Sequence, residues 1–479
     1  MVDIASRAVE AATRAGAGYA DARICRYRQQ DLSAEDQRVS GVQDLESFGI
    51  GVRVLAGGAW GFAATTDVSE AGAVAAAQRA LDVARASARV MATPVELVCE
   101  PARQLTHNTP CEVDPFAVEV DSKVGLLLDV NRRLLAHTGI KKATSAMTLR
   151  RVERLFVSSE GSVLQGAITT CWPHYAATAV DEHDARSRHY ELPPLNMGYE
   201  RIDADDLLAN TDRVAEQALE HLKAPTIEEG RTTLILEPLH LALTIHESVG
   251  HPTELDRALG MEMSLAGASF ATPDKLGKLQ YGSSIVNFVA DNTLEHGLAS
   301  WGFDDEGVEC QRWHIVKDGI FCGYGASREV AGRIGMTRAN GTCRADSWAR
   351  MPIVRQPNVC LMPGRQRLTP EELIGDTDEG IYIEGMGSFS IDQMRCNFQF
   401  GGDAFWRVRN GRLAGMLKNV TYQAITTDFW NSCDAICDER FWVRNGVLNC
   451  GKGDPMQVAQ MTHAAAPARF RNVRVRPAQ

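Results

Sequence analysis

The stretch TIHESVGHPTE, residues 244–254, organises the rest of this sequence. It continues the apolar run of residues 239–245, which contains nothing that breaks a helix, and it places His246, Glu247 and His251 at the end of that run. Two neutral imidazoles can bind zinc, and a carboxylate between them can take a proton from water that a metal activates. The pattern therefore predicts a metallohydrolase site at the end of a helix.

The spacing of the two histidines requires an irregular helix. They stand five residues apart, which in a regular α-helix puts the two rings about 140° out of phase. Gly250 precedes His251 and Pro252 follows it, and proline disfavours the helical conformation in the residue before it. We therefore expect a π-like last turn, or an unwound end, that brings His251 back toward His246. The alternative is a pair of histidines hydrogen-bonded at a helix C-terminus without any metal.

Length and composition limit the class of protein. A chain of 479 residues exceeds what one hydrophobic core usually organises, so two domains are expected. A net charge of −11 argues against nucleic acid or anionic membrane lipid as the main partner. The 12 cysteines are scattered, as is typical of reduced thiols, and the N-terminus lacks the pattern of a secretion signal. No run reaches the roughly 18 apolar residues of a membrane span, so we expect a soluble, cytoplasmic protein.

The first part of the chain predicts helices together with long antiparallel strands. We place a domain boundary at Pro225 and expect residues 1–225 to form an α/β domain, an extended sheet with helices on one side. Apolar periodicity predicts helices over 3–16, 67–89, 118–137 and 204–222, strands over 20–29, 43–56, 145–159 and 162–180, a hairpin within 47–65, and a loop over 181–199.

The second part, residues 226–479, predicts a β-rich domain that carries the metal-binding helix. A strand over 231–236 precedes that helix, and the segment 257–284 after it is predicted to be a flap over the substrate. Antiparallel pairing is indicated by three hairpin-turn signals, and one more helix is predicted over 426–437. The turns are Asp318-Gly319, Asn410-Gly411 and Asn445-Gly446. The fold class is therefore α+β.

A catalytic zinc usually takes three protein ligands, so the chain must supply one more. Cys450 stands in the glycine-rich, polar sequence NCGKG, which predicts a loop, and Lys452 could stabilise its thiolate there. From the residues alone the alternatives stay open: Glu254, His463, and the pair Cys433 and Cys437, which could also pack inward or form a second zinc site.

Several motifs, in the same order along the chain, resemble the TldD/PmbA family of metalloproteases, also called TldD/TldE. The resemblance covers nearly the whole chain. The motifs are GVRVLAGGAWGFAAT (51–65), HESVGH (246–251), FDDEGVECQR (303–312), GYGASREVAG (323–332), RQPNVCLMPG (355–364) and NCGKGDP (449–455).

In that family two related subunits pair, and only the TldD-type subunit carries HExxxH, so this chain resembles the catalytic subunit. The resemblance implies one zinc ion per catalytic subunit, held by His246, His251 and Cys450, with Glu247 as general base. It also implies an α/β N-terminal domain, a β-rich C-terminal domain, and hydrolysis of unfolded proteins or short peptides inside a dimer, either with a TldE/PmbA-like subunit or with a second copy. Pro252 departs from the pattern, since a smaller residue such as glycine is expected there.

Substrate recognition is the least specific part of the prediction. A peptide would bind as an extended strand at a sheet edge, and Gly385 and Gly387 could permit its close approach, although a bulged core strand explains them equally well. Hydrolysis of a non-peptide amide or a modified peptide during metabolite maturation is an alternative function. A non-catalytic binding subunit with a structural metal is another, and Fe²⁺ or Co²⁺ could occupy the same ligands.

Overall fold

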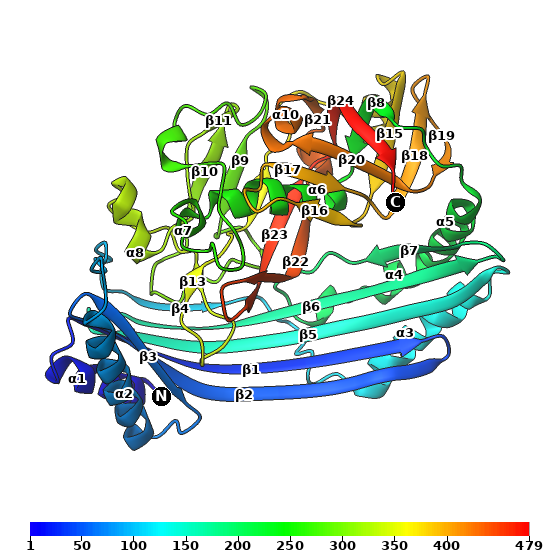
Figure 1. Cartoon of the computed structure of the whole chain (residues 1–479). Coiled ribbons are helices and arrows are strands. Elements are labelled where there is room, and N and C mark those ends of the chain that lie inside the picture. The colour runs from blue at the N-terminus through cyan, green and yellow to red at the C-terminus, as the bar shows by residue number, and fades with distance from the viewer. Residues whose placement is uncertain (479) are drawn as a thin grey trace.

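The computed structural model describes residues 1–478 and shows two layers, one above the other (Figure 1). The lower layer is a long, twisted sheet built from the N-terminal part of the chain. The upper layer is a compact β-rich body built from the second half. The mixed α+β class predicted from the sequence is confirmed.

Seven strands form the N-terminal sheet, in the order β3-β2-β1-β5-β6-β4, with β7 paired to β6 on the same edge as β4 but further along the strand. All neighbours are antiparallel except β4, which runs parallel to β6. The strands are β1 (Tyr19–Glu35), β2 (Arg38–Ala56), β3 (Ala59–Thr65), β4 (Gln104–Asn108), β5 (Ile140–Ser158), β6 (Val163–Val180) and β7 (Ala185–Glu191). The hairpin expected within residues 47–65 is confirmed as β2–β3, but β1 and β2 are longer than predicted, and β7 occupies the segment predicted to be a loop.

Helices cover one face of this sheet. The even-numbered residues of β1, such as Ala22 and Ile24, pack with α1 and α2 at one end, while Leu32 and Ala34 pack with α3 at the other. The helices are α1 (Val2–Arg14), α2 (Glu70–Ala88), α3 (Val120–Leu135), α4 (Ala204–Ala209) and α5 (Thr211–Lys223). The single helix predicted over 204–222 is therefore two helices that meet at Asn210.

The opposite face of the sheet contacts the second half of the chain through buried ion pairs. The motif FDDEG presents Asp305 to Arg154, with Nη1 to Oδ1 at 2.9 Å, and Glu306 to Arg53, with Nη1 to Oε1 at 3.0 Å. Arg53 and Arg154 project from β2 and β5, and all four side chains are at least 94 % buried. This motif therefore attaches the upper layer to the sheet below it.

The second half contains four sheets around one large apolar core. A nine-stranded sheet has the order β16-β17-β20-β24-β8-β15-β18-β19, with β21 paired to β24, and only β8 and β15 run parallel within it. A four-stranded sheet, β11-β10-β9-β14, and the hairpins β12–β13 and β22–β23 complete the body. The bounds of these strands are β8 (Gly230–Leu236), β9 (Phe288–Asp291), β10 (Arg312–Lys317), β11 (Ile320–Phe321), β12 (Cys343–Arg344), β13 (Ile353–Val354), β14 (Val359–Leu361), β15 (Glu379–Glu384), β16 (Phe389–Ile391), β17 (Asn397–Phe400), β18 (Ala404–Arg409), β19 (Arg412–Leu417), β20 (Val420–Ile425), β21 (Cys433–Ile436), β22 (Val443–Lys452), β23 (Gln457–Ala465) and β24 (Ala468–Pro477).

Helix α6 (Pro238–Ile245) runs through the middle of this body (Figure 1). Leu241 and Ile245 are fully buried in the core, together with residues from β8, β14 and β24. Glu237 caps its N-terminus by accepting from the backbone N–H of Leu239 and His240. The remaining helices are short: α7 (Leu255–Ala258), α8 (Arg328–Ala331), α9 (Pro370–Gly375) and α10 (Thr426–Asn431).

The predicted turn at Asn445-Gly446 and the predicted end of the helix over 426–437 are wrong. Asn445-Gly446 is not a turn, because it lies within β22, where Asn445 is buried and a Cβ on Gly446 would meet Leu298 Cδ1 at 2.5 Å. The helix predicted over 426–437 ends at Asn431, and Cys433 begins strand β21. The other two turns are confirmed, since Asp318-Gly319 and Asn410-Gly411 each have two positive φ angles and close the hairpins β10–β11 and β18–β19.

Within residues 1–478, no helix has the length and apolar character needed to cross a bilayer. The chain leaves α5 and enters β8 between residues 224 and 229, and a domain boundary at Pro225 stays a prediction.

Candidate metal centre

The helix that carries the HESVGH motif changes its winding at the first histidine. α6 ends at Ile245, residues His246–Gly250 form a single π turn, and a short 3₁₀ turn follows at His251–Thr253. The backbone N–H of His251 donates to the carbonyl of His246, five residues back. A π turn advances one residue more than an α turn for the same rotation, so it returns His251 to the face of His246. The irregular turn predicted from the spacing is confirmed.

Gly250 is required by close packing and not by an unusual backbone angle. A Cβ at this position would lie 1.8 Å from Oε1 of Gln356. The same Gln356 uses Nε2 to donate to the carbonyl of His246 at 3.1 Å. The RQPN segment therefore braces the π turn from outside, and only glycine leaves room for it.

Cys450 lies on a strand and not in the polar loop that its neighbours predicted. It belongs to β22, pairs with Ala459 of β23, and is 5 % exposed. The loop prediction is therefore wrong, because the glycine-rich sequence lets the hairpin pack tightly against its surroundings. Arg355 fixes the strand by donating Nη2 to the carbonyl of Cys450 at 2.5 Å.

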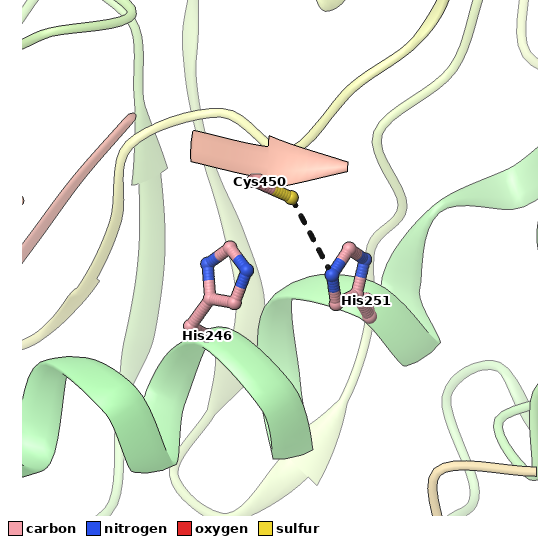
Figure 2. Close-up of side chains that lie close together, drawn as sticks. All are labelled: His246, His251 and Cys450. Carbon is pink, nitrogen blue, oxygen red and sulfur yellow. Dashed lines mark hydrogen bonds between the residues drawn. The ribbon is translucent and has the colours of Figure 1, made fainter. Parts of the chain in front are cut away.

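The structure brings His246, His251 and Cys450 together (Figure 2). Their candidate ligand atoms lie within 4.8 Å of one another, and Sγ of Cys450 is 3.5 Å from Nε2 of His251. In Figure 2 the two rings rise from the helical ribbon toward the thiol, which projects from the strand above. Two nitrogens and one sulfur converging in this way form a donor set that can hold a divalent metal ion.

Hydrogen bonds determine which nitrogen of His246 is free. His463 has Nδ1 at 3.1 Å from the carbonyl of Val359, which can only accept, so that nitrogen carries a proton. Burial lowers the pKa of His463 well below its ordinary value, so its Nε2 is unprotonated and accepts from Nδ1 of His246 at 2.9 Å. Burial also lowers the pKa of His246 to about 4. Nε2 of His246 is therefore left with a free lone pair.

His251 has the same orientation but an ionic partner. Its Nδ1 is 2.8 Å from Oε2 of Glu254. Burial alone would raise the pKa of Glu254, but Lys452 and His251 hold it well below its usual value, so the carboxylate is ionised and accepts. Nε2 of His251 is thus the nitrogen that faces Cys450.

Glu254 is itself embedded in buried charge. Nζ of Lys452 is 3.2 Å from Oε1 of Glu254 and 2.8 Å from both oxygens of Asp256. Arg257 also approaches Glu254, with Nε to Oε2 at 3.3 Å. Lys452, expected near a thiolate in an open loop, is completely buried and anchors the carboxylate behind His251.

Charge around Cys450 favours its thiolate. Burial raises the pKa of the thiol, but His251 and Arg355 outweigh burial and hold that pKa below its ordinary value. The thiolate is the form of cysteine that binds zinc.

Glu247 lies in the π turn and is 5 % exposed. Its Oε2 accepts from Nη1 of Arg395, a residue that sequence reasoning missed. Arg395 lies in the turn between strands β16 and β17 of the nine-stranded sheet, far from Glu247 in the sequence. Only the folded chain therefore brings it to the motif.

The other candidates from the sequence lie elsewhere or behind the rings. Glu254 and His463, considered above as third ligands, contact the Nδ1 atoms instead. Cys433 and Cys437 lie on and just after β21, where Cys433 is buried in the apolar core. Gly385 donates its N–H to Glu237 and Gly387 packs against the carbonyls of Gly401 and Gly402, so both have a structural explanation, and peptide binding by them stays a prediction.

Comparison with known families identifies the family of this chain. Residues 229–475 match the model described as the PmbA/TldA metallopeptidase C-terminal domain, and residues 20–87 match the model of PmbA/TldA metallopeptidase domain 1. The chain belongs to the PmbA/TldD metallopeptidase family. In this PmbA/TldD chain the RQPN and NCGKG motifs lie around the π turn, and the FDDEG motif contacts the long sheet.

Individual relatives agree with this assignment. A protein named metalloprotease from Methanocaldococcus jannaschii is 29 % identical over 91 % of this chain and 92 % of its own length. The metalloprotease TldD homolog of Haemophilus influenzae is 24 % identical over 84 % of this chain and 82 % of its own length. A zinc metalloprotease TldD homolog from Saccharolobus solfataricus is 26 % identical over 58 % of this chain and 59 % of its own length.

Solved structures show the same fold at low identity. A protein described as a putative modulator of a DNA gyrase, from Thermotoga maritima, superposes with a TM-score of 0.79 at 16 % identity, covering 99 % of both chains. TldE from Thermococcus kodakarensis superposes with a TM-score of 0.74 at 14 % identity, covering 98 % of this chain and 99 % of its own. A TldE protein and this PmbA/TldD chain thus share one architecture.

Proposed function

We propose that this chain is a zinc-dependent metallopeptidase that hydrolyses peptide bonds. The observation that supports it most is the convergence of His246, His251 and Cys450 beside Glu247. The printed names of the relatives, metalloprotease and zinc metalloprotease, agree with it.

The residues present fit zinc. Both imidazoles have Nδ1 engaged and Nε2 free, and the thiol has a pKa below its ordinary value. Zinc accepts nitrogen and thiolate ligands in tetrahedral sites, and three protein ligands leave one position for solvent or substrate. When bound, zinc would supply a Lewis acid that makes water nucleophilic near neutral pH and polarises the scissile carbonyl.

Glu247 supplies the proton transfers of the proposed reaction. Its carboxylate takes a proton from the attacking water, and the same oxygen then gives that proton to the leaving amine. Since Arg395 already holds Oε2, the remaining oxygen, Oε1, is the one that carries the proton. The four residues of the site are each at most 5 % exposed, so little bulk water reaches Glu247.

We also propose the setting in which the site works. The substrates would be unfolded proteins or short peptides, because an extended chain can reach residues that are almost completely buried. The active form would be a dimer with a TldE/PmbA-like subunit or with a second copy, and the protein would act in the cytoplasm. The shared architecture with TldE supports pairing of two related chains.

Metal analysis of purified variants tests the proposal. We expect about one zinc ion per chain in the wild type, sharp loss of zinc in His246→Ala and Cys450→Ser, and retained zinc without peptide hydrolysis in Glu247→Gln. The exposed Cys99→Ser variant is the matched control and should retain both. Equal zinc in Cys450→Ser would remove Cys450 from the site, and normal turnover in Glu247→Gln would remove Glu247 as the general base. A wild type that holds zinc and binds peptides without cleaving them would show that the metal only stabilises a binding subunit.

A further inference from the structure

The turn that carries Arg395 brings a guanidinium to the candidate general base. The turn joins β16 (Phe389–Ile391) to β17 (Asn397–Phe400), and Nη1 of Arg395 donates to Oε2 of Glu247. The arginine side chain is 15 % exposed and the glutamate side chain 7 %. An ion pair this well shielded is much stronger than one on the surface.

The chain holds this turn firmly in an unusual conformation. Arg395 has φ +60°, in the left-handed region that residues other than glycine rarely adopt. Its carbonyl accepts from Oγ1 of Thr426 at 2.9 Å, and Asp392 accepts from the N–H of Cys396 at 2.8 Å and of Asn397 at 3.0 Å. Such a conformation persists only where the surroundings fix it, as they do here, and it often marks a functional position.

The segment predicted to be a flap supports the same turn. Backbone N–H groups of Ala268 and Phe270 donate to the carbonyls of Gln393 and Met394, at 3.0 and 2.9 Å. Gly267, with φ +82°, allows this approach, since a Cβ there would lie 2.5 Å from the carbonyl oxygen of Gln393. Two separate segments therefore fix the backbone of the turn that carries Arg395.

Within the part of the chain that the structure describes, only Nη1 of the Arg395 guanidinium donates a hydrogen bond. Among residues 1–478, neither Nε nor Nη2 of Arg395 has a hydrogen-bond partner, and Nε is buried. These two nitrogens form the edge with which arginine commonly binds a pair of oxygens, or one oxygen at two points. Burial and Arg257 lower the pKa of Arg395, and the nearby charges of Glu247, Glu254 and Cys450 oppose this decrease. A buried donor without an acceptor points to a ligand that supplies one.

We propose that Arg395 is a catalytic residue whose free Nε/Nη2 edge binds the carbonyl oxygen of the scissile peptide bond as that oxygen becomes negative. The inference rests on the proposed function. Water adds to the carbonyl carbon, one of its protons goes to Glu247, and the π electrons of the carbonyl move onto the oxygen that Arg395 binds. The carbonyl then re-forms, the C–N bond breaks, and the amine leaves with the proton from Glu247.

The position of the guanidinium favours the scissile carbonyl over a carboxylate at the end of a substrate. Arg395 contacts Glu247, whose carboxylate must also reach the attacking water. The remaining donors of Arg395 therefore lie no further from the reacting carbon than about the length of one residue. A terminal carboxylate would lie at least one residue further along the peptide. Donors placed where negative charge develops act on the transition state more than on the ground state.

Replacement of Arg395 by glycine tests this role without adding strain, since glycine adopts φ +60° freely. We expect Arg395→Gly to keep its zinc and its KM for a peptide, while kcat falls roughly 100- to 1,000-fold. The affinity for a peptide with a phosphinate in place of the scissile amide, measured by calorimetry, should fall by a similar factor because the phosphinate imitates the negative tetrahedral state. Added guanidinium ion should restore part of kcat.

Controls separate the failure of this inference from failure of the proposed function. Arg365→Gly removes an arginine that is 87 % exposed and should change neither kcat nor phosphinate affinity. If the wild type neither cleaves peptides nor binds the phosphinate, the proposed function is wrong. If the wild type does both, unchanged phosphinate affinity or faster turnover in Arg395→Gly would overturn the role of Arg395. Should that variant lose zinc, Arg395→Lys, which keeps the charge beside Glu247 but lacks the two-nitrogen edge, must show the same selective loss of phosphinate affinity.

Discussion

The two histidines of the candidate metal centre present the same nitrogen to the centre, yet the chain holds them by different means. Behind His246 stands a neutral ring, His463, whose Nδ1–H donates to the carbonyl of Val359. Behind His251 stands an ionised carboxylate, Glu254, with Lys452 and Arg257 around it. One support consists of neutral groups and the other of buried charges.

The difference teaches how a buried site can tune two identical ligands. A carboxylate makes the imidazole it contacts a stronger electron donor, whereas a neutral acceptor mainly fixes the ring orientation. Buried charge is also less tolerant of change, because removing one partner leaves the others uncompensated. We therefore expect the charged support to be the more sensitive of the two.

Replacing Glu254 by Gln should have the largest effect. The amide keeps the shape of the carboxylate but leaves Lys452 and Arg257 with one negative charge fewer in a site that is 99 % buried. We expect zinc affinity to fall about 10- to 100-fold and the free energy of unfolding to fall by about 3–5 kcal/mol. Competition with a chelator and urea denaturation measure the two quantities. A variant as stable as the wild type would show that the charge network is not an essential support.

Replacing His463 by Gln should have a smaller effect, because a neutral acceptor can still reach Nδ1 of His246. We expect about a tenfold loss of zinc affinity and a loss of about 1–3 kcal/mol in the free energy of unfolding. The same two measurements apply. If His463→Gln weakened zinc binding more than Glu254→Gln, the neutral support would be the more important one and the comparison would be reversed.

His240 sharpens the comparison by showing a buried histidine that lies outside the centre. Its Nδ1 is 2.8 Å from the carbonyl of Gly385 and its Nε2 is 2.9 Å from the hydroxyl of Tyr422, and burial lowers its pKa to about 4. In the unfolded chain a histidine binds a proton below about pH 6.5. Lowering the pH from about 6.5 to 4 therefore favours the unfolded state, by at most about 1.4 kcal/mol per pH unit.

Comparison with His240→Gln measures this contribution. The variant should be less stable than the wild type near pH 7 because it loses one of two buried hydrogen bonds, and the difference should shrink as the pH falls toward 4. Urea denaturation at several pH values follows it. A constant difference across that range would mean that His240 binds its proton equally well in both states.

An exposed ion pair should show the smallest effect. Arg474 and Glu229 are 51 % and 55 % exposed, and water and salt screen their interaction. Glu229→Gln should leave both zinc affinity and the urea midpoint unchanged within error. A clear loss of stability would show that charge matters in this chain even where water surrounds it.

Local features of the centre could be predicted from the sequence, and distant contacts could not. The five-residue spacing with Gly250 and Pro252 required an irregular turn, and the structure contains one. Cys450 was selected partly for the wrong reason, since the polar residues around it lie on a buried strand. Local sequence cannot show that Lys452 finds two carboxylates inside the molecule.

Glu254 and His463 were predicted only as alternative third ligands, and their contacts with the two Nδ1 atoms depend on how β22, β23 and α7 pack around the helix. Arg395 gave no signal, because its neighbours in sequence predict only a turn. The long strands β1, β2, β5 and β6 were predicted, since alternation and glycine turns are local, although β1 and β2 extend further and β4 and β7 were missed. Asn445-Gly446 failed because tertiary packing placed a turn-forming pair within a strand.

The hairpin β22–β23 carries both Cys450 and His463, while the histidines that they contact lie about 200 residues earlier in the chain. During synthesis the HESVGH segment leaves the ribosome long before its partners exist. The newly made chain therefore cannot assemble this centre until His463 has emerged. A polypeptide that stops short of the hairpin would lack Cys450 and His463, so the order of the sequence would delay the proposed hydrolysis until the residues around the centre are in place.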